Sequence, residues 1–265
     1  MSRLSVGRGG ARTLASLAVS AAALVTAAGP LGETVTASPG SGTVEASAYD
    51  AVSVAPAAVR RAASLVPAST VVAPYTFLMK QRGSTRPVRW NPCVTHTYRL
   101  NPGGTTSRER AFVRAQIALA ARLAGITLIY RGTTTFIPTS SNYTRVKKAT
   151  GADIVIAFAN PGTGRGRSNL VTGSSVGTGG FSASGTSTGL LWARTGFAVF
   201  RSSLVHYSAA IRRAVYLHEL GHALGLGHVA RRGEVMYPSA TGALRPTAGY
   251  VNGLRAVGRS AGCPA

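Results

Sequence analysis

The stretch that decides the fold lies at residues 218–228 and reads HELGHALGLGH. His218 and His222 are four residues apart, so on a helix their imidazoles lie on one face, one turn apart. Two imidazoles placed in this way can bind one Zn²⁺ at about 2.0–2.1 Å each. Gly225 can adopt the positive φ that ends a helix, and the following turn would bring His228 round as a third ligand. The pattern predicts a helix that carries a zinc site.

Glu219 follows His218 directly, so we expect its carboxylate to lie beside the metal and not on it. There it can accept a proton from an attacking water. Three histidines leave the fourth position of zinc open, which is typical of a catalytic site. Two other interpretations remain. One is a helix face with solvated or core histidines, and the other is a structural zinc, which would need a fourth protein ligand and would have no use for Glu219.

The extended motif resembles that of the metzincin metallopeptidases, which adds a methionine in a downstream Met-turn. Met236, in the sequence EVMYP at 234–238, matches that methionine, and the resemblance implies that it packs beneath the zinc ligands. The order Met-Tyr-Pro is similar to the matrixin branch. The sequence RWNPC at 89–93 is similar to the start of secreted actinobacterial matrixin-like domains. Tyr237 follows the methionine directly, so we assign it no role at the zinc.

The resemblance implies a fold and an activity. The fold would be an α+β, zincin-like domain with a twisted, mostly parallel sheet, an antiparallel edge strand, two main helices and a C-terminal helix. In this family the edge strand helps to hold an extended substrate by backbone hydrogen bonds. Residues 197–200 or the loop before them are the counterpart of that strand. The activity would be that of a secreted zinc endopeptidase, with Glu219 as general base toward a zinc-activated water.

Periodic patterns from residue 75 onward predict alternating strands and helices. We expect strands at 96–100, 126–130, 153–159 and 197–200, and helices at 107–124 and 208–224. A weaker helix is expected at 247–257, because Gly249 and Gly253 lower its propensity. Residues 160–190 are rich in Gly, Ser and Thr and are predicted to form a long loop.

The chain divides into three segments by composition. Residues 1–28 have three arginines followed by an apolar stretch and are predicted to be a signal peptide, with an uncleaved N-terminal anchor as the alternative. Residues 29–74 are dominated by small residues and predict a low-complexity linker or short pro-segment. Residues 75–265 form the predicted peptidase domain. We therefore expect a secreted, extracellular protein without a stable membrane span.

Cys93 and Cys263 are the only cysteines, and in an exported chain we expect them to form a disulfide that ties the start of the domain to its end. Free or intermolecular thiols, or Cys93 as a thiol that blocks zinc, are the alternatives. Many matrixins block their zinc with a pro-segment cysteine, but no cysteine precedes Cys93, so we do not expect latency by that route. We interpret His96 and His206, the two histidines outside the motif, as structural, although His206 could support the site.

The formal net charge is +22, with 29 Lys and Arg against 7 Asp and Glu. Too few histidines and acids remain for a second metal site, so we expect one catalytic zinc, no structural zinc and no carboxylate-rich calcium site. The charge itself has three interpretations: a solvated arginine-rich surface, adhesion to polyanions, or a preference for acidic substrates. Arg212 and Arg213, shortly before His218, could affect the field of the cleft.

These features predict a monomer that cleaves proteins or peptides, associates at most loosely with polyanionic surfaces and binds no specific nucleic acid. The alternative function is a cationic extracellular protein that binds polyanions or cell surfaces and has a non-proteolytic zinc site. The intact Glu219 favours the peptidase, because a binding protein would not require a base beside the metal.

Overall fold

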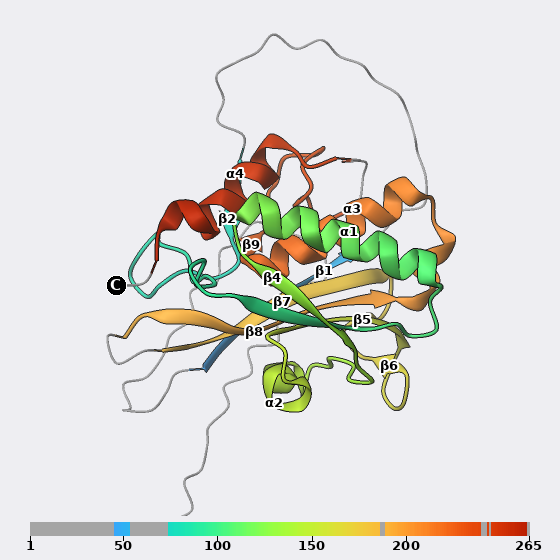
Figure 1. Cartoon of the computed structure of the whole chain (residues 1–265). Coiled ribbons are helices and arrows are strands. Elements are labelled where there is room, and N and C mark those ends of the chain that lie inside the picture. The colour runs from blue at the N-terminus through green and yellow to red at the C-terminus, as the bar shows by residue number, and fades with distance from the viewer. Residues whose placement is uncertain (1–44, 54–73, 186–188, 240–242, 244, 264–265) are drawn as a thin grey trace, which may run out of the picture.

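The computed structural model describes residues 45–53, 74–185, 189–239, 243 and 245–263 (Figure 1). The predicted signal peptide lies outside these residues. The nine strands among them are β1 (Glu45–Ser53), β2 (Thr76–Phe77), β3 (His96–Asn101), β4 (Leu128–Thr133), β5 (Ile154–Pro161), β6 (Arg167–Ser168), β7 (Ser175–Gly185), β8 (Leu191–Arg201) and β9 (Leu226–Gly227). The four α-helices are α1 (Ser107–Ala124), α2 (Val146–Thr150), α3 (Ala209–Leu224) and α4 (Ala248–Val257). No helix in the described part of the chain is long and apolar enough to cross a membrane.

The main sheet has the strand order β1-β7-β8-β5-β3-β4, and the short β6 pairs with β5. Strands β4, β3, β5 and β8 are parallel to one another, whereas β7 is antiparallel to β8 and β1 is antiparallel to β7. The fold is therefore the predicted mixed domain with a mostly parallel sheet and antiparallel strands at one side. Residues 197–200 lie inside β8, which is parallel to β5, so the antiparallel strand β7 comes from the segment before them.

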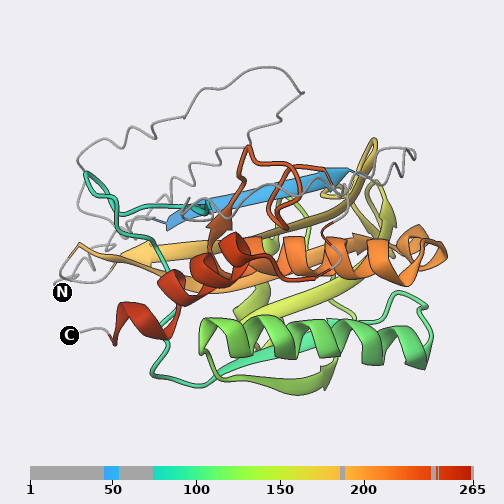
Figure 2. The same ribbon diagram turned by 90° about the horizontal axis from the view of Figure 1, so that it is seen from above.

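The sheet separates two hydrophobic cores. Along β5, Ile154, Ile156 and Phe158 face a large core, whereas Val155 and Ala157 and their neighbour Ala159 face a smaller one. Residues of α1, α3 and α4 complete the large core, and α2 covers the small core on the opposite face (Figures 1 and 2). Because both faces are buried, β5 is apolar from Ile154 to Ala159 and does not alternate in polarity.

The two long helices begin and end where local chemistry favours it. The Thr106 hydroxyl accepts a hydrogen bond from the Glu109 N–H at 3.2 Å, and the Ser208 hydroxyl accepts one from the Ile211 N–H at 3.3 Å. Gly125 (φ 67°) and Gly225 (φ 116°) end α1 and α3 in the left-handed conformation that glycine tolerates. These signals explain why the predicted limits of both helices agree with the structure.

The prediction of a loop over residues 160–190 is wrong, because the segment contains β6 and β7. Glycine disfavours a strand, but two glycines of this segment allow α3 to pack closely against it. A Cβ atom on Gly179 would lie 2.2 Å from the backbone oxygen of Glu219, and one on Gly177 would lie 2.7 Å from the Glu219 Oε1. Helix α3 therefore crosses β7 so closely that only glycine fits at these two positions. Upstream, residues 45–53 of the predicted linker or pro-segment form β1.

The C-terminus is fastened to the start of the domain. Cys93 and Cys263 form a disulfide with a Cα–Cα distance of 5.6 Å. Next to it, the guanidinium of the buried Arg89 donates hydrogen bonds from Nη2 to the carbonyl oxygens of Ala261 (2.9 Å) and Gly262 (2.8 Å). A covalent and a charge-assisted contact thus hold the segment after α4 against the segment before β3.

We predict that Cys93→Ser combined with Cys263→Ser will lower the stability of the domain. The disulfide joins residues 170 positions apart, and a crosslink over a loop of this size restricts the unfolded chain strongly. The expected loss is about 2–5 kcal/mol, observable as a lower Tm in calorimetry. Reduction of the unaltered protein is the control and should give the same Tm, whereas an unchanged Tm in both would contradict a stabilising disulfide.

Candidate metal centre

Three imidazoles converge at the C-terminal end of α3. His218 and His222 lie one turn apart on the helix, and their Nε2 atoms are 2.9 Å apart. The Nε2 atom of His228 lies 3.1 Å from that of His218 and 3.2 Å from that of His222. Ligands around a tetrahedral zinc ion with bonds of about 2.0–2.1 Å are roughly 3.3 Å apart. The triangle of nitrogens therefore fits three of the four ligand positions of zinc, as the sequence predicts.

Backbone carbonyls orient the two helical imidazoles. The Nδ1 atom of His218 lies 2.7 Å from the oxygen of Val235, and the Nδ1 atom of His222 lies 2.8 Å from the oxygen of Leu226. A carbonyl oxygen only accepts hydrogen bonds, so each Nδ1 carries the proton and each Nε2 presents its lone pair to the centre of the triangle. Burial, and next the nearby His228, lower the pKa of His222 well below its usual range. Both effects favour the neutral form that a metal requires.

His228 reaches the site by a turn that begins at Gly225. The N–H of Gly225 donates to the carbonyl oxygens at the end of α3, and its φ of 116° turns the chain back. Strand β9 then pairs with β2, and the Thr76 hydroxyl donates a 2.7 Å hydrogen bond to the His228 carbonyl oxygen. The third imidazole is thus positioned by backbone pairing with the first strand of the domain.

Met236 lies against the turn of α3 between the two helical histidines. A Cβ atom on Gly221 would lie 2.5 Å from the Met236 sulfur and 3.0 Å from the Tyr250 ring, so the helix, the methionine and α4 touch at this point. The Met236 carbonyl oxygen accepts a 3.0 Å hydrogen bond from the Val229 N–H, next to His228. The methionine therefore packs against the turn of α3 between His218 and His222 and is tied to the segment that follows His228.

Glu219 lies on the opposite side of the helix turn from this methionine, against β7. Its side chain is fully buried, and its carboxylate lies beside the backbone of Gly177. Because Gly177 and Gly179 lack side chains, the turn of α3 that carries Glu219 lies flush with the sheet. The acid that follows the first histidine is thereby held between the metal ligands and the outermost strands.

Comparison with known proteins agrees with this geometry. The family model of matrixin matches residues 133–248, a range that holds β5, β7, β8 and all of α3 with the three histidines and Met236. The part of the chain that carries the three histidines is thus similar to matrixins. This match supports a zinc metallopeptidase in general.

Two further comparisons contribute less. A crystal structure of metalloproteinase-II from Bacteroides fragilis matches with 18% sequence identity and a TM-score of 0.38, over 65% of this chain and 57% of that one. The chain thus spans a little over half the length of that protein. A search of curated proteins finds no significant match.

A buried polar cluster, which the sequence analysis missed, links α3 of the matrixin-like domain to α1. The Glu109 carboxylate accepts a hydrogen bond from the Tyr216 hydroxyl and forms a 3.1 Å ion pair with Arg212. Burial, and next this carboxylate, raise the pKa of Tyr216, so its hydroxyl stays protonated. The guanidiniums of Arg212 and Arg213 both lie over the Phe112 ring of α1. Both arginines therefore contact α1, and α3 is anchored one turn before its first histidine.

The two other histidines lie away from the metal centre. His96 is buried, its Nε2 atom lies 2.8 Å from the carbonyl oxygen of Asn91, and its ring packs edge-on against Trp90 at 4.9 Å. These contacts are structural. His206 lies exposed in a short 3-10 helix (Ser202–His206) before α3. Neither residue belongs to the group of three possible metal ligands, His218, His222 and His228.

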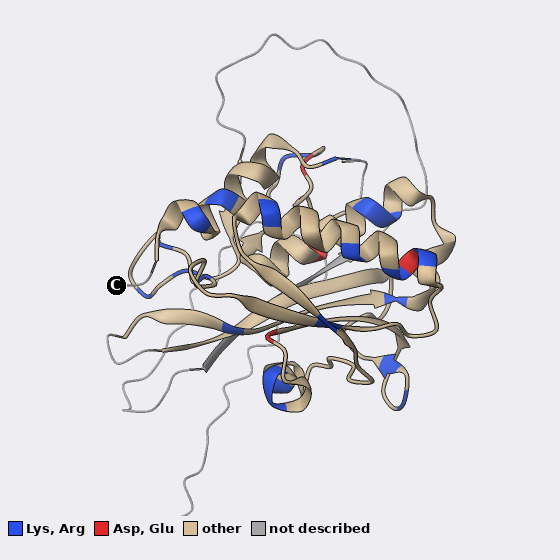
Figure 3. Ribbon diagram, in the orientation of Figure 1, with Lys and Arg blue, Asp and Glu red and all other residues tan. Residues whose placement is uncertain are grey.

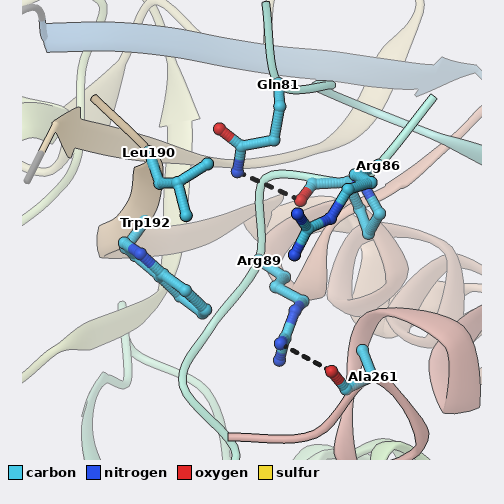
Figure 4. Close-up of a pocket in the computed structure, with 7 residues that line it drawn as sticks. Gln81, Arg86, Arg89, Leu190, Trp192 and Ala261 are labelled. Carbon is cyan, nitrogen blue, oxygen red and sulfur yellow. Dashed lines mark hydrogen bonds between the residues drawn. The ribbon is translucent and has the colours of Figure 1, made fainter. Parts of the chain in front are cut away.

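A cavity of about 240 Å³ lies at the end of β8, apart from the imidazoles (Figure 4). The Arg89 guanidinium crosses it, stacks 4.9 Å from the centre of the Trp192 ring and donates to Ala261 (Figure 4). Gln81 closes another wall through hydrogen bonds to the backbone of Leu191. In this cavity Arg89 therefore holds the C-terminal segment, and Gln81 holds the first residue of β8.

We predict that His222→Ala will reduce zinc affinity by at least about 100-fold, because only two of three ligands would remain. Metal analysis of the purified protein after dialysis should then show substoichiometric zinc. A chelator should lower the Tm of the unaltered protein but not of the variant, since only a bound ion stabilises the folded state. His206→Ala is the matched control and should keep its zinc. Equal zinc content in both variants would contradict the predicted site.

Proposed function

We propose that this chain is a secreted zinc-dependent endopeptidase in which Glu219 is the general base. One observation carries the proposal: the Nε2 atoms of three histidines converge within 3.2 Å of one another, and an acid, Glu219, follows the first of them on α3. A structural zinc would call for a fourth protein ligand, and the described residues that group here are the three histidines alone. The open position is what a hydrolytic centre needs.

The proposed mechanism assigns a role to each residue of the site. His218, His222 and His228 would hold one zinc ion through Nε2. Zinc at such a site supplies a Lewis acid that polarises a carbonyl and lowers the pKa of water to about 7. Glu219 would accept the proton of the attacking water and then pass it to the leaving amine. Its burial against Gly177 leaves the carboxylate few alternative positions, which keeps the base oriented.

Substrate would bind along β7. This strand is antiparallel to β8 and passes directly over the turn of α3 that carries Glu219. An extended peptide that adds to its outer edge would form backbone hydrogen bonds with β7 and would lie beside the catalytic acid. Main-chain pairing of this kind binds polypeptides of many sequences, which suits an endopeptidase.

Secretion and the division of the chain are part of the proposal. The charged and apolar N-terminus supports a signal peptide at 1–28, a linker or pro-segment at 29–74 and the peptidase domain at 75–265. The disulfide between Cys93 and Cys263 is compatible with an oxidising compartment. We propose one catalytic zinc and a monomeric enzyme outside the cell.

The positive charge supports a second, weaker property. Acids of the described domain are engaged internally: Glu109 with Arg212, Asp153 with Lys147, and Glu234 with the Thr247 hydroxyl. The arginines and lysines are instead spread over all four α-helices and several strands (Figure 3). We propose that this surface associates loosely with polyanions, without a specific nucleic acid.

We predict that Glu219→Gln will keep zinc and lose peptidase activity by about 10²–10⁴-fold, since an amide cannot accept the proton. The measurement is cleavage of casein by the zinc-loaded protein, with metal content determined in parallel. Activity of the unaltered protein should disappear with a chelator and return with zinc. A variant that retains both zinc and full activity would sink the assignment of Glu219 as base.

Binding to a polyanion column should depend on total charge and not on one patch. Neutralising Arg108, Arg114 and Arg122 on α1 should lower the salt concentration needed for elution. Binding through fewer basic residues releases fewer counterions from the polyanion, and this release favours binding. The matched control neutralises Arg145, Lys148 and Arg165, which are also exposed but lie elsewhere. We expect similar shifts for both variants. A loss confined to one of them would reveal a specific site and contradict loose association.

A further inference from the structure

We propose that β1 is a built-in competitor that occupies the substrate-binding edge of β7 and keeps the intact chain latent without a cysteine. The inference rests on the proposed function and deepens it, because it names what regulates the same site. It concerns only the backbone of residues 45–53 and its pairing with the domain.

The pairing runs along β7 from Ser175 to Ser184. Strand β1 runs antiparallel to it from the pair Glu45↔Ser184 to the pair Ser53↔Ser175, with one irregularity between Val52 and Ser53. The other edge of β7 is already paired with β8, so β1 forms the last strand of the sheet on this side (Figure 2). Without β1, the outer backbone groups of β7 would be an unpaired edge, the type of surface that accepts an extended peptide.

The register places β1 at the level of the catalytic acid. Val52 is opposite Gly177 and Asp50 is opposite Gly179, and these two glycines are the residues that touch Glu219. Paired strands lie about 4.7–4.9 Å apart, so the backbone of β1 passes one strand spacing beyond the glycines. Helix α3 is also in contact with β1. A substrate paired with β7 beside Glu219 would need the same space.

Exclusion follows from the geometry of a β-ladder. Each outward N–H and C=O group of β7 pairs with one neighbouring strand, so β1 and a substrate strand cannot both be bound. Strand β1 is joined to the domain by residues 54–74, and a tethered ligand has an effective concentration on the order of millimolar. A substrate present at micromolar concentration competes poorly with it. Competition of this kind raises the apparent KM and leaves kcat unchanged.

Pairing of β1 with β7 would provide latency without a cysteine in the N-terminal segment. No cysteine precedes Cys93, so the N-terminal segment has no thiol with which to block the zinc. Pairing with β7 needs no particular side chain, because the backbone supplies the hydrogen bonds. A segment built largely from small residues, such as EASAYDAVS at 45–53, can therefore act as the competitor.

The test cuts the chain on either side of β1. In one variant, residues 60–65 are replaced by the recognition site of a sequence-specific protease, so that cleavage detaches β1 from the domain. In the matched control the same site replaces residues 35–40, so that cleavage leaves β1 attached. Both proteins are loaded with zinc, cleaved and passed over a sizing column. Casein cleavage is then measured, and the mass of each product shows whether β1 has left.

We expect the cut after β1 to lower the apparent KM by about 10–100-fold, the factor that a tethered competitor at an effective concentration of about 1 mM gives when its Kd is about 10–100 μM, and the cut before β1 to change nothing. Equal activation or no activation by both cuts, with β1 shown by mass to have left in the first variant, would overturn the inference. If no form cleaves casein although all contain zinc, the proposed function itself fails. The two failures are therefore distinguishable.

A second measurement does not depend on activity. Amide hydrogen exchange should show the N–H groups of Ser175–Gly185 that face β1 protected in the intact chain and faster after the cut that removes β1. The full chain with Ala48→Pro and Tyr49→Pro should show the same loss of protection, because two consecutive prolines remove at least one N–H that faces β7. The control, Ala57→Pro with Ala58→Pro, lies outside the ladder. Unchanged exchange along β7 in the cut protein would refute the pairing.

Discussion

The close approach of α3 to β7 is the contact on which the rest of the structure depends. The helix carries two histidines and the acid, and it can lie flush with the sheet only because Gly177 and Gly179 have no side chains. A methyl group at Gly179 would overlap the backbone of Glu219, so any larger residue would lift the helix from the strand. The two glycines therefore set how closely α3 packs against β7.

The opposite side of the same helix is packed in the same way. Gly221, between His218 and His222, admits the Met236 sulfur and the Tyr250 ring, and the Tyr250 hydroxyl donates a 2.8 Å hydrogen bond to the Leu217 carbonyl oxygen. Backbone carbonyls of the surrounding chain orient both helical imidazoles. Helix α3 is thus packed between Gly177 and Gly179 of β7 on one side and Met236 on the other. Neither imidazole can rotate without losing a buried hydrogen bond.

The few acidic residues of the domain mostly form structural contacts. Glu109 joins α1 to α3, Asp153 binds Lys147 and the Thr97 backbone, and Glu234 lies at the start of α4. Each carboxylate has a structural partner, and Glu219 is the one placed beside the three histidines. Most of the positive charge is consequently left without an acidic partner in the described domain.

The sequence by itself determined the features that depend on near neighbours in the chain. The spacing of His218 and His222 and the periodic patterns at 107–124 and 153–159 predicted the helix of the metal site, α1 and β5, because these signals act over a few residues. Only the tertiary structure decided that a glycine-rich segment is β7 and that residues 45–53 pair with it. Local propensity opposes a strand in the first and is weak in the second. Strand β7 forms because its glycines allow α3 to pack closely against it, and β1 forms because it pairs with the outer edge of β7. Both contacts join residues that are far apart in the sequence.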